Sequence, residues 1–216
     1  MKRFNSQSPP PEGFTLPGVL ITLGGVGVIA AMTLPSIITK YQKEVTALKV
    51  KKFYNTINNA VRLSTAENGD VSEWLGEKLT DYEHNLKFLQ TYILPFIKYN
   101  KLDNCFDNAV CVYLTSGGMF MFRYDVNGGD IFYFVNGKLE GNKRNKFDFQ
   151  FDKSDTNVKI FVEPYSFQWD GTIESLKSGS TRGCISSPNT AMGQFCTKWI
   201  QLNNWKIPDD YPWLTN

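Results

Sequence analysis

The sequence predicts an α+β protein in which one long N-terminal helix packs on an antiparallel sheet and disulfides hold the C-terminal region together. Three observations support this fold class. The chain carries no charge from Phe14 to Ile38, it has a helical repeat without proline or glycine from Tyr41 to Asn68, and it alternates like a sheet from Val110 to Gly141. With 216 residues and 42% hydrophobic content, it is long enough for one domain with a real core plus an appendage.

The same observations divide the chain into four parts. We expect a polar leader, an apolar helix segment, an amphipathic continuation of that helix, and a globular α+β body. Their respective boundaries are 1–13, 14–38, 39–69 and 70–216.

The apolar segment, 14–38, has the length of a membrane span. As a helix it would extend about 37 Å, against roughly 30 Å of bilayer hydrocarbon. Gly24, Gly25 and Gly27 weaken its middle, and Pro35 removes one backbone hydrogen bond near its end. We therefore expect a helix that is apolar on all sides and easy to bend.

The following segment, 39–69, has one apolar face. Its apolar and small residues recur at steps of three and four, with basic residues between them, which indicates an amphipathic helix. Asn68-Gly69 is a typical helix end. The residues expected on the apolar face are Val50, Phe53, Tyr54, Ile57, Ala60, Val61 and Ser64.

The body begins with short helices and a loop over 70–100. Three or four strands of an antiparallel meander are then expected between Val110 and Gly141, because Asn-Gly between alternating runs is a strong hairpin signal. The remaining features are two further strands at 146–151 and 158–163, a loop-rich tail from Gly183 that packs on the body, and strand breaks at 116–118, 127–128 and 136–137.

The four cysteines are spaced C-x5-C and C-x11-C, at Cys105, Cys111, Cys184 and Cys196. Neither spacing fits the short pairs of zinc sites or the C-x2-C of redox enzymes. Two disulfides are the simpler interpretation; three pairings are possible, and short loops favour Cys105–Cys111 and Cys184–Cys196. The alternative is four free thiols in a reduced compartment, against which the apolar segment argues.

The composition gives little sign of catalysis or of nucleic-acid binding. Net charge is +2, no long basic run occurs, and the single histidine, His84, has the surroundings of a surface residue. There is no G-x-S-x-G, histidine cluster or phosphate-binding loop, so we expect no enzyme and no cofactor. Asp125, Asn127 and Asp130 are weak calcium candidates, but their spacing departs from the EF-hand pattern and a hairpin turn explains them with fewer assumptions.

The N-terminus resembles that of type IV pilins and of type II secretion pseudopilins. The matching features are a short basic leader, Gly13, then Phe14-Thr15-Leu16 and about twenty apolar residues. Gly27 and Pro35 fall where that family has a helix-weakening glycine and a proline. The resemblance is specific over about 25 residues, while the arrangement of helix, sheet and stapled C-terminus matches more loosely.

The resemblance implies a processing and assembly pathway. A prepilin peptidase would cut between Gly13 and Phe14 and methylate the new amine of Phe14, leaving 203 residues with a net charge of +1. The subunit would sit in the lipid bilayer of the bacterial inner membrane, with its N-terminus cytoplasmic and its body periplasmic or extracellular. With other pilin or pseudopilin subunits and an inner-membrane assembly platform, it would enter a pilus-like filament for secretion, adhesion or DNA uptake. Phe14, Gly18, Gly27 and Pro35 would be its assembly residues.

Two residues depart from the family pattern. Gly18 stands where the family usually has a glutamate, which is thought to pair with the N-terminal ammonium of a neighbouring subunit. An unpaired ammonium in a helix bundle is costly. Two interpretations follow: a minor subunit located at the filament tip, which we favour over the major shaft subunit, or a paralogue that assembles poorly or not at all. Pro17 would fall in the permissive first turn of the cleaved helix.

Two other interpretations compete with this one. The segment could be an ordinary signal peptide, with a soluble secreted protein starting near Met32, or the anchor of a membrane-bound enzyme. The five lysines between Lys40 and Lys52 also exceed the two basic residues before the segment, and a simple positive-inside count would place the body in the cytoplasm.

Overall fold

The structure is a computed structural model that describes residues 16–74, 81–105, 108–125, 128–141, 144–151, 162–178, 182–184 and 193–213. The chain forms two compact units, Met1–Gln42 and Lys43–Asn216, each considered by itself below. The second unit, called the body here, includes the amphipathic part of the N-terminal helix.

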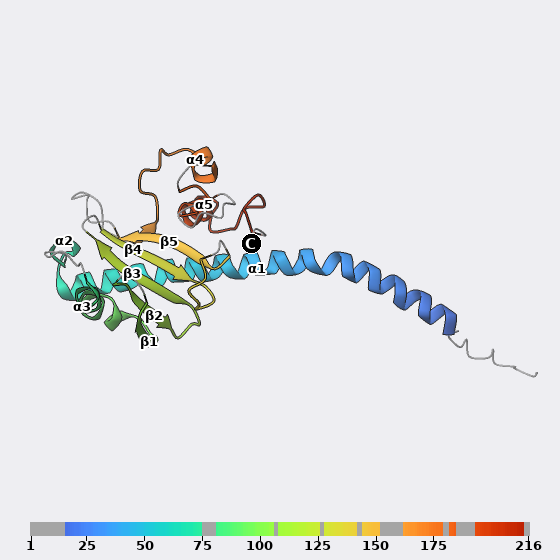
Figure 1. The fold of residues 1–216 in the computed structure, drawn as a ribbon, viewed down its shortest axis with the longest axis horizontal. Helices are drawn as coiled ribbons and strands as arrows, with labels where there is room; N and C mark the ends of the chain where they lie inside the picture. Colours follow the sequence, from blue (N-terminus) through green and yellow to red (C-terminus); the bar gives the residue numbers. More distant parts are fainter. Residues whose placement is uncertain are drawn as a thin grey trace, which may run out of the picture. The chain divides into compact units, whose positions relative to one another are not determined.

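Helix α1 runs without interruption from Leu16 to Asn68, a length of 53 residues (Figure 1). Pro35 lies within it. The helix ends where Gly69 adopts a φ of +80°, a left-handed conformation that glycine reaches without steric cost. The expected continuation of the apolar helix into an amphipathic one, and its end at Asn68-Gly69, are confirmed.

The body contains one sheet of six strands in the order β1-β2-β3-β4-β5-β6, and every neighbouring pair is antiparallel. This is a simple meander, in which each strand pairs with the next along the chain (Figure 1). The strands are β1 Tyr99–Asn104, β2 Val110–Leu114, β3 Met119–Asp125, β4 Gly128–Phe134, β5 Lys146–Phe151 and β6 Val162–Pro164.

The sequence predicted a strand at one end of this sheet and missed the strand at the other end. Strand β1 was not expected, because its residues, YNKLDN, are polar and stay largely exposed along the edge of the sheet. Of the strand expected at 158–163, the part from Val162 is present as β6, and the rest lies outside the described residues.

The Asn136-Gly137 turn closes strand β4 but does not begin another strand. Gly137 donates its N–H to the carbonyl of Phe134 at 3.2 Å, and no strand follows before β5 among the described residues. The buried side chain of Asn145 holds this loop, since it donates to the carbonyls of Lys138 and Glu140 at 2.9 and 3.0 Å. The described residues between Val110 and Gly141 therefore form three strands, the lower of the two numbers expected.

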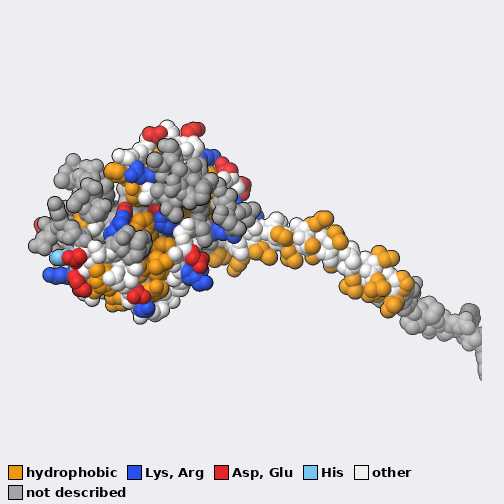
Figure 2. All heavy atoms as spheres, in the orientation of Figure 1, with side chains coloured by type: hydrophobic (Ala, Val, Ile, Leu, Met, Phe, Trp, Pro, Cys, Tyr) orange, Lys and Arg blue, Asp and Glu red, His pale blue; other side chains and the backbone are white. Residues whose placement is uncertain are grey.

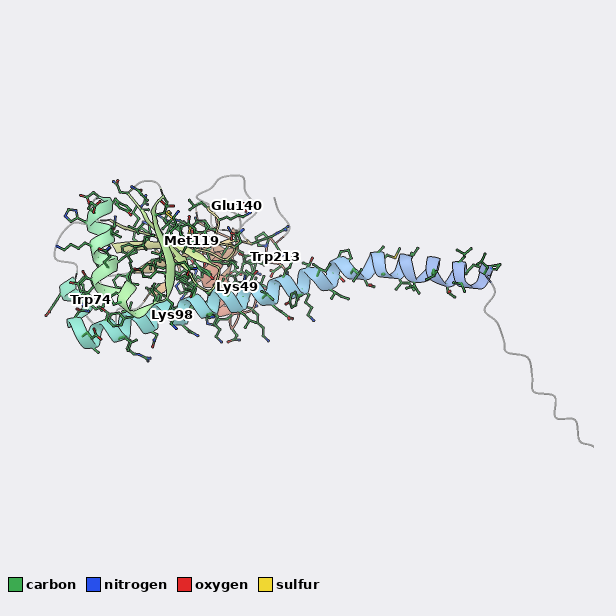
Figure 3. All side chains as sticks on the ribbon, turned by 90° about the horizontal axis from the view of Figure 1, so that it is seen from below. Lys49, Trp74, Lys98, Met119, Glu140 and Trp213 are labelled. Carbon is green, nitrogen blue, oxygen red and sulfur yellow. A yellow bond between two sulfur atoms is a disulfide. The ribbon has the colours of Figure 1, made fainter. Side chains whose placement is uncertain are left out.

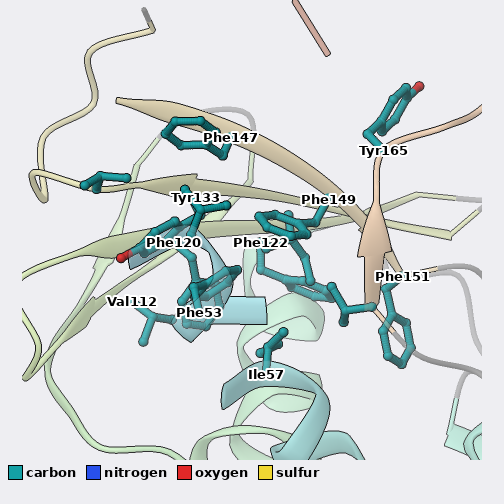
Figure 4. Close-up of a cluster of buried hydrophobic side chains, with 14 of the residues drawn as sticks. Phe53, Ile57, Val112, Phe120, Phe122, Tyr133, Phe147, Phe149, Phe151 and Tyr165 are labelled. Atoms are coloured by element: carbon teal, nitrogen blue, oxygen red, sulfur yellow. The ribbon is translucent and has the colours of Figure 1, made fainter. Parts of the chain in front are cut away.

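The amphipathic half of α1 covers one face of the sheet (Figure 4). Phe53 stacks on Tyr133 at a centroid distance of 4.3 Å and contacts the rings of Phe120 and Phe149 at 5.5 and 5.3 Å. Alternation along β3, β4 and β5 brings these rings to the same face. The buried residues of α1 are Thr46, Ala47, Val50, Phe53, Ile57, Ala60, Val61 and Ser64.

Tyr54 also lies on this interface, but its ring is only half-buried. Its hydroxyl donates to Glu163 Oε1 at 2.9 Å, and Gln201 donates to the other oxygen of that carboxylate at 3.1 Å. Burial and the neighbouring Glu163 carboxylate raise the pKa of Tyr54 to about 12. The predicted apolar face is thus confirmed, with Tyr54 at its polar border.

Short helices surround this core. In α3 the Asp81 side chain accepts from the backbone N–H of His84 at 3.0 Å, and this hydrogen bond lowers the pKa of Asp81. The exposed imidazole of His84 pairs with the same carboxylate at 2.8 Å, which agrees with its interpretation as a surface residue. The helices are α2 Val71–Trp74, α3 Tyr82–Tyr92, the 3-10 turn η1 Leu94–Phe96, α4 Ile173–Ser178 and α5 Cys196–Leu202.

The C-terminal tail packs on the body, as the sequence predicts. Tyr211 and Trp213 are buried, and Lys43 donates its ammonium to the carbonyl of Pro208 at 3.2 Å. Helix α5 adds a helical element to a region expected to consist of loops.

Candidate membrane-insertion and assembly segment

The segment of α1 from Leu16 to Ile38 exposes apolar side chains and carries no charge. Figure 2 shows it in the colour of hydrophobic residues, and Figure 3 shows side chains leaving the ribbon on both sides. Its most apolar 18-residue window has no buried residue. Helix α1 is long and apolar enough to cross a membrane. A helix surface that is apolar on all sides is stable in lipid or against other apolar helices.

The three hydroxyl side chains of this segment are satisfied inside the helix. Thr22 donates to the carbonyl of Gly18 at 3.1 Å, Thr33 to that of Ile29 at 3.0 Å, and Ser36 to that of Thr33 at 2.8 Å. An unpaired polar group in hydrocarbon costs several kcal/mol. These internal hydrogen bonds remove that cost, so the segment is chemically suited to a water-free environment.

The glycines of the segment have no packing role within the chain. A methyl group added at Gly24, Gly25 or Gly27 would meet no atom within 4 Å. Pro35 lacks a backbone N–H, so α1 loses one backbone hydrogen bond at that position. Any requirement for these residues must come from bending or from a neighbour outside the described chain.

The structure describes Pro17 and Gly18 but not the residues at the expected cleavage site. Gly13 and Phe14 lie outside the described residues. Pro17 is the second residue of the described helix, where a missing N–H is tolerated, and Gly18 lies in the same first turn.

The cysteines form two disulfides, Cys105–Cys111 and Cys184–Cys196. This is the pairing that short loops favour. The first links the end of β1 to β2, and the second joins the segment after α4 to the start of α5.

The calcium candidates do not form a site among the described residues. Asp130 pairs with Arg123 at 3.4 Å across β3 and β4. The side chain of Asp125 and all of Asn127 lie outside what the structure describes. Within the described part of the chain, no three Asp, Glu, His or Cys side chains come together to hold a metal ion.

The face of α1 turned away from the sheet forms a shallow groove, called the α1 groove below. Lys51, Lys52 and Arg62 are exposed on it, and Leu48 leaves 67% of its surface uncovered. The sequence shows that this part of the chain is rich in lysine, but it does not predict that Phe96 of η1 lines the same groove. The lining residues are Leu48, Lys51, Lys52, Asn55, Thr56, Asn58, Asn59, Arg62 and Phe96.

A buried carboxylate, Asp148, lies on strand β5 and was not singled out from the sequence. Its side chain is 3% exposed; Oδ2 accepts from the Lys146 ammonium at 3.1 Å, while Oδ1 has no partner among the described residues. Burial raises the pKa of Asp148 to about 6, and the Lys146 cation opposes this rise only in part. In the sequence KFDFQF, Asp148 simply alternates with phenylalanines, a pattern that predicts a solvent-facing position.

Comparison with known proteins identifies a family but no activity. The sequence pattern of a family of unknown function, DUF6613, matches residues 36–214, which is most of the chain. No curated protein and no solved structure matches the sequence or the fold. The chain, with its long helix, six-stranded antiparallel sheet and two disulfides, therefore belongs to the DUF6613 family.

Proposed function

We propose that the protein is a non-enzymatic structural subunit, a minor pseudopilin or minor type IV pilin, that enters a filament through its N-terminal helix. The observation that carries the proposal is α1 itself. One unbroken helix joins an uncharged segment with exposed apolar side chains to a half that is built into the core of the body. This arrangement suits a subunit that is held first by lipid and then by like helices, since both environments satisfy the same apolar surface.

Several features of the segment support this proposal over a plain anchor. The glycines at 24, 25 and 27 leave room for close helix approach, and nothing in the described chain occupies that room. Pro17 lies in the first turn, where a new N-terminus after Gly13 would tolerate it. Gly18 offers no carboxylate to a neighbour's ammonium, which favours a minor position in the filament over the repeating shaft.

The proposal is tested by intact mass and N-terminal sequencing of the protein from its native membrane. A chain of 203 residues that begins with N-methylated Phe14 is expected. A start near Met32 would identify an ordinary signal peptide, and an intact Met1 would identify a plain anchor. Either of these two results would overturn the filament proposal.

A further inference from the structure

The body is neutral as a whole, but its charges are segregated. Three of the 23 basic residues and one of the 21 acidic residues precede Lys43, so the body carries twenty of each sign. From Lys43 to Arg62 there are five basic residues and one acidic residue. Residues 67–83 contain six acidic residues and one basic residue. Opposite charges therefore gather in two neighbouring stretches of the chain.

The positive stretch contains the α1 groove. Lys51, Lys52 and Arg62 are exposed there, and none has a carboxylate partner among the residues that the structure describes. Arg62 donates only to the side-chain oxygen of Asn59, at 2.7 Å. Leu48 and Phe96 contribute apolar surface next to these charges. Aromatic residues and arginine are enriched in protein–protein contact surfaces.

The described residues of the negative stretch, 67–74 and 81–83, lie at the α2–α3 end of the body, where α1 finishes (Figure 1). Glu67, Glu73 and Glu83 are exposed on this end, and no ion pair to them is present among the described residues. Trp74 fixes α2 to the end of α1, because its indole N–H donates to the carbonyl of Gly69 at 3.1 Å and its ring stacks on Tyr92 at 4.5 Å.

We propose that the α1 groove binds the acidic α2–α3 end of a second copy of this chain, so that bodies stack head to tail. The two surfaces have opposite charge, and each has charged side chains unpaired among the described residues. Complementary charges of this kind steer association and fix its register.

An anionic membrane surface is the other candidate occupant, and it fits the groove less well. Arg62 lies 19 residues along α1 from the start of the body at Lys43, which is about 28 Å at 1.5 Å per residue. Attraction to lipid headgroups decays over about 8 Å at physiological ionic strength. A lipid surface that met the lysines nearest Lys43 would leave Arg62 and Phe96 unused, whereas the end of a second body can reach the whole groove.

The proposed contact is heterologous, because different surfaces of the two copies meet. From Asn55, in the middle of the groove, to Glu67 the helix rises about 18 Å. A copy displaced along the axis by this order of distance would bring its acidic end to the groove of its neighbour. Repetition of such a contact gives an open stack and not a closed dimer. This inference rests on the proposed function for the parallel orientation of the copies, since both would be anchored in one membrane.

The contact is tested by zero-length carbodiimide cross-linking of the full chain in detergent, with an equal mixture of ¹⁴N- and ¹⁵N-labelled protein. The reagent joins only ammonium and carboxylate groups in direct contact, and mixed-isotope products report contacts between copies. Links from Lys51 or Lys52 to Glu67, Glu73 or Glu83 are expected, in products larger than a dimer. High salt is expected to suppress them.

Charge reversal makes the test specific. Lys51→Glu/Lys52→Glu and Glu67→Lys/Glu73→Lys are each expected to abolish the links between positions 51–52 and 67–73, because two groups of like charge then face each other and the reagent cannot join them. The mixture of the two variants is therefore the informative measurement. Mixing the two variants is expected to restore links between positions 51–52 and 67–73, because opposite charges meet again. The matched control, Lys138→Glu/Lys206→Glu, reverses two exposed lysines outside both surfaces and is expected to change nothing.

Three results would overturn the head-to-tail contact. The first is the absence of mixed-isotope links between the two surfaces, and the second is a mixture of variants that links no better than each variant alone. The third is loss of the links when anionic lipid is added at constant salt, which would assign the lysines to lipid headgroups. A chain with methylated Phe14 that forms no such links would keep the proposed function and reject the contact. Such links in a chain with an unprocessed N-terminus would keep the contact and reject the proposed function.

Discussion

Replacing Asp148 by asparagine is expected to remove a loss of stability that the body suffers as the pH rises from 4 to 8. Asp148 is buried on β5, and the described titratable or charged groups that interact with it are Lys146, Asp130, Tyr165 and Tyr211. Among the described residues, the carboxylate of Asp148 accepts a hydrogen bond from Lys146 alone. Asp130 raises the pKa of Asp148, and Asp148 in turn raises the pKa values of Tyr165 and Tyr211, so the ionised form of Asp148 is poorly compensated.

The magnitude follows from the pKa of Asp148. Its folded-state pKa of about 6 lies above the ordinary aspartate value of 3.8, so the folded protein holds this proton more tightly than the unfolded chain does. The resulting contribution to stability is fully present below about pH 4 and is lost as the pH rises through about 6. A shift of roughly two units corresponds to about 3 kcal/mol at pH 8. The asparagine side chain of the variant does not ionise, so the variant should be free of this loss.

The assay is urea unfolding of the full chain in detergent at pH 4 and pH 8, with the disulfides intact. All five tryptophans lie within the body, so their fluorescence reports its unfolding. Asp148→Asn leaves one amide hydrogen-bonding group unpaired, at a cost common to both pH values. The informative quantity is therefore the change with pH, and wild type is expected to lose about 2.5 kcal/mol more than the variant from pH 4 to pH 8.

The control is Asp103→Asn, which changes an exposed carboxylate on β1. The Lys101 hydrogen bond lowers the pKa of Asp103, so this variant is not expected to gain stability at pH 8. Two results would show that Asp148 is not a poorly compensated buried carboxylate. In the first, the free energies of unfolding of Asp148→Asn and of wild type change with pH in parallel; in the second, the variant becomes less stable relative to wild type as the pH rises.

Three further perturbations probe the core, the disulfides and the assembly segment. Phe53→Ala is expected to lower the free energy of unfolding by about 3–5 kcal/mol, because this 3%-exposed ring of α1 packs against the sheet. In the same urea assay, Lys52→Ala at the exposed neighbouring position is expected to change this free energy by no more than about 0.5 kcal/mol. Replacing both Cys184 and Cys196 by alanine is expected to cost roughly 2–4 kcal/mol, and a urea midpoint that does not move would show that this disulfide does not stabilise the body. Gly18→Glu is expected to raise the amount of the protein recovered in sheared filaments; unchanged incorporation would mean that the missing carboxylate does not define its role.

The sequence alone determined the elements whose signals are local. The helix pattern of α1 identified its buried face, including Phe53 and Ile57, because a side chain's position on a helix follows from its place in the 3.6-residue repeat. Asn68-Gly69 identified the helix end by another local signal, because glycine adopts the left-handed conformation seen at Gly69 without steric cost. Alternation between turn residues located β2, β3, β4 and β5, and loop length favoured the disulfide pairing that the structure shows.

Tertiary structure alone decided the features that depend on what covers a residue. Strand β1 is polar and exists because β2 offers it an edge to pair with, so its residues carry no strand pattern of their own. Asp148 alternates like a surface residue but is buried, and its pKa is raised, where β5 lies near Tyr211 of the tail. The α1 groove joins Phe96 to a helix face more than 30 residues earlier in the chain. Burial and juxtaposition of distant segments are properties of the whole packed chain, and no local repeat encodes them.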